Sequence, residues 1–214
     1  MTTSPGKMER SYAYSIIAAT FDYPDAGFFE LVSSGKVAKQ LHDAFTAIYP
    51  QLEDSVAWEK LSSAASCEEM EVEFSRLFDV GASGPPCPLN AGIYLDDRMQ
   101  ALEESVRFYN YFGLTAGEDF EELPDHITTQ LEFMHFLAHT QGELDSEPEQ
   151  AANYLRAQRD FLKRQLGRWI PQLHERATEN HANPFYATLV GLLDQFLRLE
   201  QESIQAGCGI IVSH

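Results

Sequence analysis

The chain has 214 residues, of which 15 are Lys or Arg and 33 are Asp or Glu, so its formal net charge is −18. A chain this acidic repels phosphate backbones, which argues against nucleic acid as a partner. Hydrophobic residues make up 44% of the sequence and aromatic residues 12%, a composition that suits a packed core and does not suit disorder. We therefore predict one domain that spans residues 1–214.

The sequence gives no sign of a membrane anchor or of disulfide bonds. No stretch approaches the roughly 18 to 20 apolar residues of a membrane span, and the first residues lack the apolar region of a secretory signal peptide. Cys67, Cys87 and Cys208 are odd in number and widely spaced, which favours reduced thiols. We expect a cytoplasmic protein without membrane insertion.

The first third of the chain predicts several short helices. The first should end at Pro24, because apolar side chains recur before it at helical spacing. Its predicted stripe consists of Met8, Tyr12, Ile16, Ala19 and Tyr23. Shorter helices are expected around 25–34, 36–49 and 54–65, separated by glycine or proline.

A capping box predicts the start of the next helix. Ser66 is followed three residues later by Glu69, the spacing at which side chains satisfy free N–H groups at a helix N-terminus. An apolar stripe then extends the helix to about Asp79. Residues 81–90 hold two glycines and three prolines, so we expect a Pro-rich loop near 81–95 between two groups of helices.

Two helices are predicted directly after the loop. Asp96 or Asp97 can cap the first, and Gly113 can end it. Its predicted stripe is Met99, Leu102, Val106 and Tyr109. The second should begin at Pro124, which suits a first helical position and would place Asp125 and His126 in the first turn.

Two more helices complete the chain. Ser146 and Glu149 form a second capping box, which predicts one long helix that Pro171 kinks or ends. Asn183 and the proline after it predict the start of the last helix, ending near Gly207. Its broad apolar stripe, Phe185, Leu189, Leu192, Leu193, Phe196 and Leu197, predicts deep burial.

Alternating β-branched runs are missing from the sequence, and only 209–213 faintly resembles a strand. The predicted fold class is therefore all-α, a single compact multi-helix bundle.

One helix carries a pattern that could bind a metal. Glu132 and His135 have the Glu-x-x-His spacing of di-iron bundles, but such a site needs two of these pairs and the chain has one. His135 and His139 could share zinc, although no glutamate lies between them as in zinc proteases. A helical metal-binding enzyme that uses Glu132, His135 and His139 is therefore the alternative function, and a polar helix surface is the simpler interpretation.

Positive charge is concentrated on one predicted helix. It carries Arg156, Arg159, Lys163, Arg164 and Arg168, a third of all Lys and Arg. Such a stripe can bind anions. In a strongly acidic chain it is more simply a solvated face that pairs with neighbouring carboxylates.

Three segments together resemble one family, the TorD/DmsD/NarJ chaperones. They are Glu73-Phe-Ser-Arg-Leu-Phe78, the Gly84-Pro-Pro86 loop leading to Tyr94, and Glu122-Leu-Pro-Asp-His-Ile127 running into Leu131-Glu-Phe-Met134. Asn183-Pro-Phe-Tyr186 with the Leu-rich helix and Glu200 also fits, so the resemblance covers roughly residues 9 to 202. The Pro-Asp-His-Ile element is its most specific part.

The resemblance implies an all-helical cytoplasmic chaperone without a cofactor of its own, not an enzyme. It would bind the signal peptide or N-terminal segment of a molybdenum-cofactor oxidoreductase subunit and assist cofactor insertion and assembly before export. The implied partner is the catalytic subunit of a molybdopterin oxidoreductase, through its twin-arginine signal peptide. The expected oligomeric state is a monomer or a homodimer.

The resemblance also implies a peptide-binding surface. Matched residue by residue, it consists of Phe74, Leu77, Phe78, Pro86, Tyr94, Asp125, His126 and Glu132. Many family members have Pro-Pro-Tyr-Glu-Ser where this chain has Pro85-Pro-Cys-Pro-Leu-Asn90. This variant resembles the subgroup that serves respiratory, type II DMSO-reductase-like dehydrogenases and reductases.

Overall fold

The computed structural model describes residues 6–64, 66–82, 84–115, 122–144 and 146–211. The α-helices are α1 (Gly6–Ala18), α2 (Ala26–Ser33), α3 (Lys36–Ile48), α4 (Cys67–Phe74), α5 (Arg98–Tyr111), α6 (Ile127–Glu143), α7 (Pro148–Arg164), α8 (Leu166–Glu179) and α9 (Pro184–Ile211). Shorter elements are the 3-10 turns η1 (Ala19–Phe21), η2 (Pro50–Leu52), η3 (Trp58–Ser62) and η5 (Ala91–Ile93), and the π-helical segment η4 (Ser75–Asp79). The described ranges contain no β-strand, only two isolated bridges, so the all-α prediction is confirmed.

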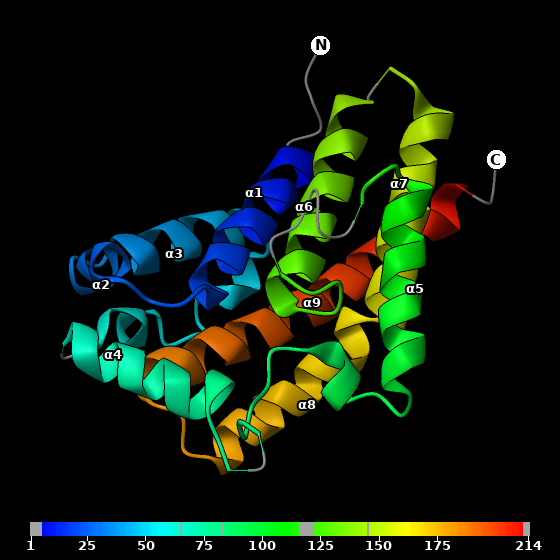
Figure 1. The fold of residues 1–214 in the computed structure, drawn as a ribbon. Helices are drawn as coiled ribbons and strands as arrows, with labels where there is room; N and C mark the ends of the chain where they lie inside the picture. Colours follow the sequence, from blue (N-terminus) through cyan, green and yellow to red (C-terminus); the bar gives the residue numbers. More distant parts are fainter. Residues whose placement is uncertain (1–5, 65, 83, 116–121, 145, 212–214) are drawn as a thin grey trace.

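The long helix α9 crosses the whole molecule (Figure 1). It packs against α7 and α8, while α1 packs against α6 and α3. In Figure 1, α2, α3 and α4 lie at one end and α5 and α7 lie at the other. None of the described helices combines the length and the apolar character that a membrane crossing requires.

The core forms around the apolar stripe of α9. Asn183 caps this helix, because its side-chain oxygen accepts a hydrogen bond from the N–H of Tyr186 at 2.9 Å. All six residues of the predicted stripe are at most 2% exposed. The start and the buried face of α9 are therefore as predicted. The helix runs to Ile211, beyond the expected end near Gly207.

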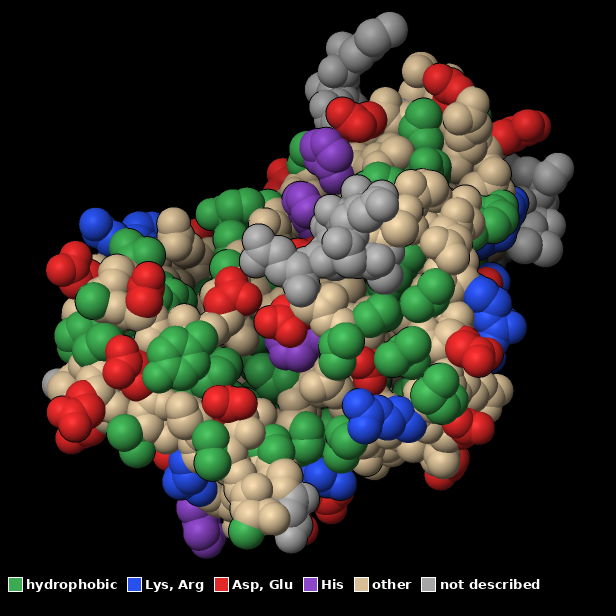
Figure 2. Space-filling model, viewed as in Figure 1, with side chains coloured by type: hydrophobic (Ala, Val, Ile, Leu, Met, Phe, Trp, Pro, Cys, Tyr) green, Lys and Arg blue, Asp and Glu red, His purple; other side chains and the backbone are tan. Residues whose placement is uncertain are grey.

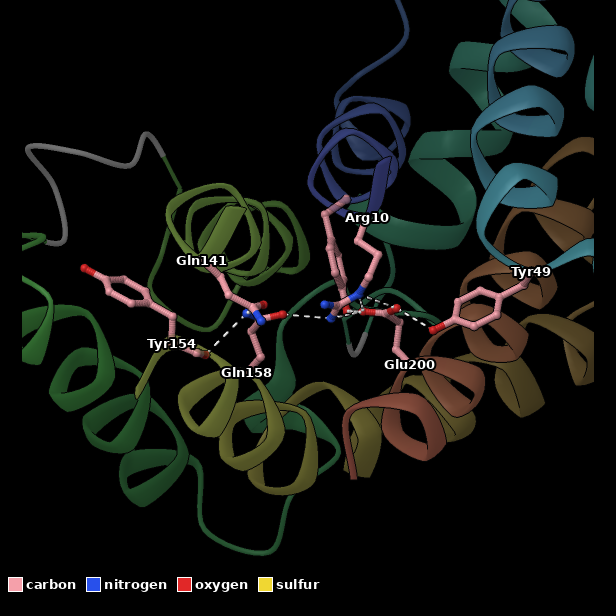
Figure 3. A network of polar contacts seen from close by, with 7 residues as sticks. Arg10, Tyr49, Gln141, Tyr154, Gln158 and Glu200 are labelled. Carbon is pink, nitrogen blue, oxygen red and sulfur yellow. Dashed lines mark hydrogen bonds and ion pairs between the residues drawn. The ribbon is translucent and has the colours of Figure 1, made fainter. Parts of the chain in front are cut away.

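A buried ion pair connects the first helix to the last (Figure 3). The guanidinium of Arg10 on α1 donates from Nε and Nη2 to the carboxylate of Glu200 on α9, at 2.8 and 2.6 Å. The hydroxyls of Tyr14 and Tyr49 donate to the same carboxylate at 2.9 and 2.6 Å. Arg10 also donates to Gln158 of α7 at 2.7 Å, so three helices and the end of α3 meet at one charged centre.

Two helices bury a different face from the one predicted. Tyr12 and Tyr23 of the first predicted stripe are 48% and 56% exposed, while the core side of α1 carries Arg10 and Tyr14. In α5, Met99 is 63% exposed. The residues buried there are Ala101, Ser105 and Tyr109. In both helices the buried side contains polar or small residues, which apolar periodicity passes over.

The long helix predicted after residue 146 is two helices. The chain breaks at Gln165 (φ −118°, ψ −100°), not at Pro171, which lies inside α8. The Gln165 amide is buried and donates to Glu104 at 3.1 Å, so a tertiary hydrogen bond holds the break. No side-chain cap is present at the start of α7, whose first residue is Pro148.

Two smaller expectations also differ from the structure. The helix expected around 54–65 is limited to η3, a 3-10 turn. Of the faint strand at 209–213, the first three residues belong to α9, and the rest lies outside the described residues. Short 3-10 turns and helix ends carry too few residues for periodicity to define them.

We predict that Glu200→Gln strongly destabilises the fold. The substitution keeps the shape of the side chain but leaves the Arg10 guanidinium buried without its counter-charge, which typically costs about 3–5 kcal/mol. Urea unfolding should show this loss, whereas Glu202→Gln, on the exposed side of the same helix, should unfold like the wild type. Equal stability of the two variants would contradict the structural role of the ion pair.

Candidate functional site

A groove of about 370 Å³ lies where the end of η1, the π-helical segment η4 and the approach to α6 meet. We call it the aromatic groove. Its apolar lining consists of Phe21, Tyr23, Phe74, Phe78 and Leu89, and its polar lining of Asp22, Asp79, Asn90, Glu122 and His126. On the face shown in Figure 2, apolar and acidic side chains lie next to one another between α4 and the start of α6.

The apolar side of the groove is a chain of edge-to-face aromatic rings. The Tyr23 and Phe74 ring centroids are 5.5 Å apart, those of Phe74 and Phe78 are 5.2 Å apart, and Phe78 continues to Tyr186 at 5.3 Å. Such pairs add about 0.5–1.5 kcal/mol each beyond area burial. Tyr23 is 56% exposed, so its ring is available to a bound ligand while the others hold it in place.

A change of helix type presents Phe78 to the groove. Ser66 starts α4 as predicted, because its hydroxyl accepts from the N–H of Glu69 at 3.1 Å. The last turn then widens into η4, in which Val80 N–H donates to Ser75 O, five residues back. Single π turns are frequent at functional sites. This one places Leu77 in the core, fully buried, and Phe78 in the groove lining.

Asp125 attaches the Pro-rich loop to the start of α6. One carboxylate oxygen accepts from Gly92 N–H at 3.0 Å, and the other accepts from the Asn90 side chain at 3.2 Å. A Cβ at position 92 would lie 3.0 Å from Asp125 Oδ2 and 2.6 Å from Arg98 Cγ, so only glycine permits this close approach. The predicted placement of Asp125 in the first helical turn is wrong, because α6 begins at Ile127.

His126 is the N-cap residue of α6 and lines the groove. Its Nδ1 lies 2.7 Å from the Thr128 hydroxyl. Burial lowers the pKa of His126 below its ordinary value of 6.5, against the opposing influence of Glu122 and Asp125. At neutral pH the ring is therefore uncharged and can both donate and accept a hydrogen bond.

The groove lining carries charge of one sign only. Asp22, Asp79 and Glu122 lie on it, and none of its lining residues is Lys or Arg. Carboxylates beside an apolar floor suit a ligand that combines a basic group with an apolar stretch. The arrangement can bind such a segment, but it offers no nucleophile activated by a neighbouring base.

The structure brings together only part of the predicted peptide-binding surface. Phe74, Phe78 and His126 line the groove, whereas Leu77 and Asp125 have no exposed surface and can only position their neighbours. Pro86, Tyr94 and Glu132 are not part of its lining.

Tyr94 has a structural environment of its own. Its ring lies between Trp169, 5.3 Å away, and the Arg176 guanidinium, 4.5 Å from the ring centroid. Its hydroxyl donates to Pro88 O at 2.9 Å. Tyr94 therefore joins the Pro-rich loop to α8.

The sequence patterns missed the contribution of the segment that follows α1 and η1 to the site. Asp22 and Tyr23 line the groove, whereas the sequence pattern places Tyr23 in the apolar stripe of the first helix. The available signal was Pro24, since a proline that ends a helix often leaves the residue before it outside the helical stripe.

The two histidines of the alternative metal site are engaged elsewhere. His135 Nδ1 donates to the Ser11 carbonyl at 2.9 Å, and His139 Nε2 lies 3.5 Å from Glu143. The two imidazole rings stack with centroids 6.0 Å apart. Across the described residues, no three His, Cys, Asp or Glu side chains are grouped so that they could hold a metal ion.

Comparison with known proteins gives consistent matches. The model of the family named nitrate reductase delta subunit matches residues 38–175. The perchlorate reductase assembly chaperone protein of Dechloromonas aromatica is 30% identical over 202 residues, 92% of this chain and 90% of the relative. The selenate reductase assembly chaperone protein of Thauera selenatis is 29% identical over 171 residues, 76% of this chain and 74% of the relative.

A solved structure supports the fold. The crystal structure described as a redox enzyme maturation protein from Archaeoglobus fulgidus matches with a TM-score of 0.54 at 21% sequence identity. The match covers 89% of this chain and 93% of that chain.

We predict that Asp125→Ala destabilises the fold. The substitution leaves the Gly92 N–H buried without its acceptor, at a cost of about 1–3 kcal/mol. Chemical denaturation should show this loss, with Glu122→Gln, an exposed side chain of the same segment, as the control. Wild-type stability of Asp125→Ala would mean that the loop does not depend on this carboxylate.

We also predict that His126 makes stability depend on pH. Because its folded-state pKa lies below 6.5, the unfolded chain takes up the proton first as the pH falls through that value. The free energy of unfolding should then decrease, by at most about 1.4 kcal/mol per pH unit. His126→Gln should remove this part of the slope between about pH 7.5 and 5.5, and parallel curves for the two proteins would contradict the buried, neutral imidazole.

Proposed function

The chain belongs to the nitrate reductase delta subunit family, and we propose that it is an assembly chaperone for the catalytic subunit of a molybdenum-cofactor oxidoreductase. It binds the signal peptide or N-terminal segment of that subunit reversibly in the aromatic groove. It releases the segment when cofactor insertion and assembly are complete, before export. The relatives named above support this role, since their names describe assembly of reductases and not catalysis.

The observation that carries the proposal is the chemistry of the groove. A twin-arginine signal peptide has a basic segment followed by an apolar one, and the groove offers three carboxylates beside a row of aromatic rings. The apolar segment of the peptide contacts the ring of Tyr23 and the rings of Phe74 and Phe78 that pack with it. The basic segment lies against the acidic side, where the net charge of −18 also favours encounter.

The names of the relatives narrow the class of client. They include assembly chaperones of perchlorate, selenate and chlorate reductases and of dimethyl sulfide dehydrogenase. These names agree with the resemblance of the Pro85-Pro-Cys-Pro-Leu-Asn90 variant to the subgroup that serves type II enzymes. We therefore place the client among respiratory dehydrogenases or reductases of that type, and the chaperone in the cytoplasm.

Binding should depend on Tyr23. We predict that Tyr23→Ser weakens binding of a synthetic peptide, two consecutive arginines followed by an apolar stretch, by at least about tenfold, or roughly 1.4 kcal/mol. The ring is 56% exposed, so its loss should leave the melting temperature nearly unchanged. Fluorescence anisotropy with a labelled peptide measures the affinity.

Tyr12→Ser is the matched control, because Tyr12 is 48% exposed on the neighbouring helix and is not part of the groove lining. It should bind like the wild type. If Tyr23→Ser also binds like the wild type, the aromatic groove is not the peptide site.

A further inference from the structure

A second groove lies between α5 and α7, at the end of the molecule away from α2, α3 and α4 (Figure 1). It measures about 580 Å³, within the range of roughly 300–1,000 Å³ that is typical of ligand sites. We call it the arginine groove. Arg107, Arg156 and Arg164 line it together with Phe108, Tyr111 and Phe112.

The charge of this groove is opposite to that of the molecule. Its lining holds three arginines and two carboxylates, those of Glu104 and Asp160, whereas the whole chain has 15 basic and 33 acidic residues. In a strongly negative protein, a local excess of positive charge attracts a negatively charged ligand.

Among the residues that the structure describes, two of the three arginines have no strong carboxylate partner. Arg156 donates to the side-chain oxygen of Asn153, a neutral group, at 2.7 Å. Arg107 lies 3.9 Å from Glu103, in a pair whose side chains are 70% and 64% exposed, and such exposed pairs contribute little. Arg164 is different, because it lies 3.1 Å from Glu104. Arg107 and Arg156 can therefore bind incoming carboxylates.

The aromatic residues give the groove an apolar wall. Phe108 is held by edge-to-face contact with Phe161, with ring centroids 5.1 Å apart, and Phe112 packs on Tyr154 at 5.0 Å. Tyr111 is 78% exposed. Tyr111 also packs edge to face on Phe112, with ring centroids 5.0 Å apart. Packed rings beside one exposed tyrosine are typical of surfaces that anchor an apolar side chain of a partner.

The form of the groove favours a linear ligand over a compact phosphate. Its walls are the sides of two helices, and the Gln100 N–H near the α5 N-terminus is already bonded to Asp97, so it lacks the free backbone donors of a phosphate site. Arg156 and Arg164 are eight residues apart on α7, about 12 Å along the axis. Carboxylates two turns apart on a bound helix, roughly 11 Å along its axis, match this spacing.

We propose that the arginine groove is a second binding site, which takes an amphipathic acidic helix of a partner protein. The apolar face of that helix lies on Phe108, Tyr111 and Phe112, and its carboxylates pair with Arg107 and Arg156. The site is separate from the aromatic groove and has the opposite charge preference, so one chaperone can hold two different segments at the same time.

The test uses a labelled helical peptide of about 16 residues, with Phe and Leu on one face and Glu on both flanks, and a second peptide in which Gln replaces every Glu. The double variant Arg107→Gln/Arg156→Gln should bind the Glu peptide at least about tenfold more weakly than wild type in fluorescence anisotropy. Wild type should bind the Gln peptide at least about tenfold more weakly as well.

Lys39→Gln/Lys60→Gln is the matched control, because it removes the same charge from exposed side chains of α3 and η3. This double variant should bind the Glu peptide within about twofold of wild type. The peptide with two consecutive arginines, which tests the aromatic groove, should not compete with the Glu peptide for wild type. All four substituted side chains are exposed, so melting temperatures near wild type establish that the variants are folded.

Four results would overturn the proposal. They are equal losses in the two double variants, equal binding of the two peptides, the absence of saturable binding, and self-association of the wild type that Arg107→Gln/Arg156→Gln abolishes. The last would identify the groove as an interface between copies of this chain, and sedimentation velocity distinguishes it. None of these results bears on the aromatic groove, which lies on other elements.

Discussion

The Arg10–Glu200 ion pair is the contact on which the arrangement of the helices depends. It is almost fully withdrawn from water, with residue exposures of 8% and 0%. Removing two charges from water is costly, and the attraction between them offsets that cost only when the remaining donors and acceptors are also bonded. Tyr14, Tyr49 and Gln158 complete these bonds. A displaced α1 or α9 would leave a buried charge unpaired, so the pair defines one position for the first helix relative to the last.

The position of α1 in turn creates the aromatic groove. Ser11 contacts His135 in the middle of α6, and Asp22 and Tyr23 lie in the same groove as His126 at the start of α6. As residue numbers rise along α1 they fall along α6, so the two helices are antiparallel neighbours. The end of η1 and the beginning of α6 therefore form two sides of the groove, and α4 with η4 forms another. Asp125 fixes that beginning through the loop, and the buried ion pair fixes the neighbouring helix.

Local signals in the sequence were sufficient to predict several helix starts. The caps Ser66, Asp97 and Asn183 each act on a backbone N–H three residues away, so short-range spacing defines them. The buried faces of α1 and α5 and the break at Gln165 were predicted wrongly, because buried polar contacts between distant helices decide them. The residues of the aromatic groove also divide into those that local sequence indicates and those that only contacts between distant segments bring in. Phe74, Phe78 and His126 lie in segments that resemble a known family, whereas Asp22 and Tyr23 join them only through the α1–α6 pairing.

Charged residues have two separate roles in this protein. Arginines pair with nearby acidic side chains, and the net negative charge attracts a basic peptide. Most arginines of the α7–α8 region neutralise nearby acids, as in the pairs of Arg159 with Asp160 and Arg164 with Glu104. Such pairing reduces the self-repulsion of a chain with charge −18. The acidic residues in excess of arginine and lysine produce a negative electrostatic potential at the surface. This potential attracts a basic peptide over about a Debye length, roughly 8 Å at physiological salt, and so governs the rate of encounter. Contact with the aromatic rings begins only after encounter. Residence time in the groove therefore depends on Tyr23 and its packed neighbours, and salt should change capture far more than release.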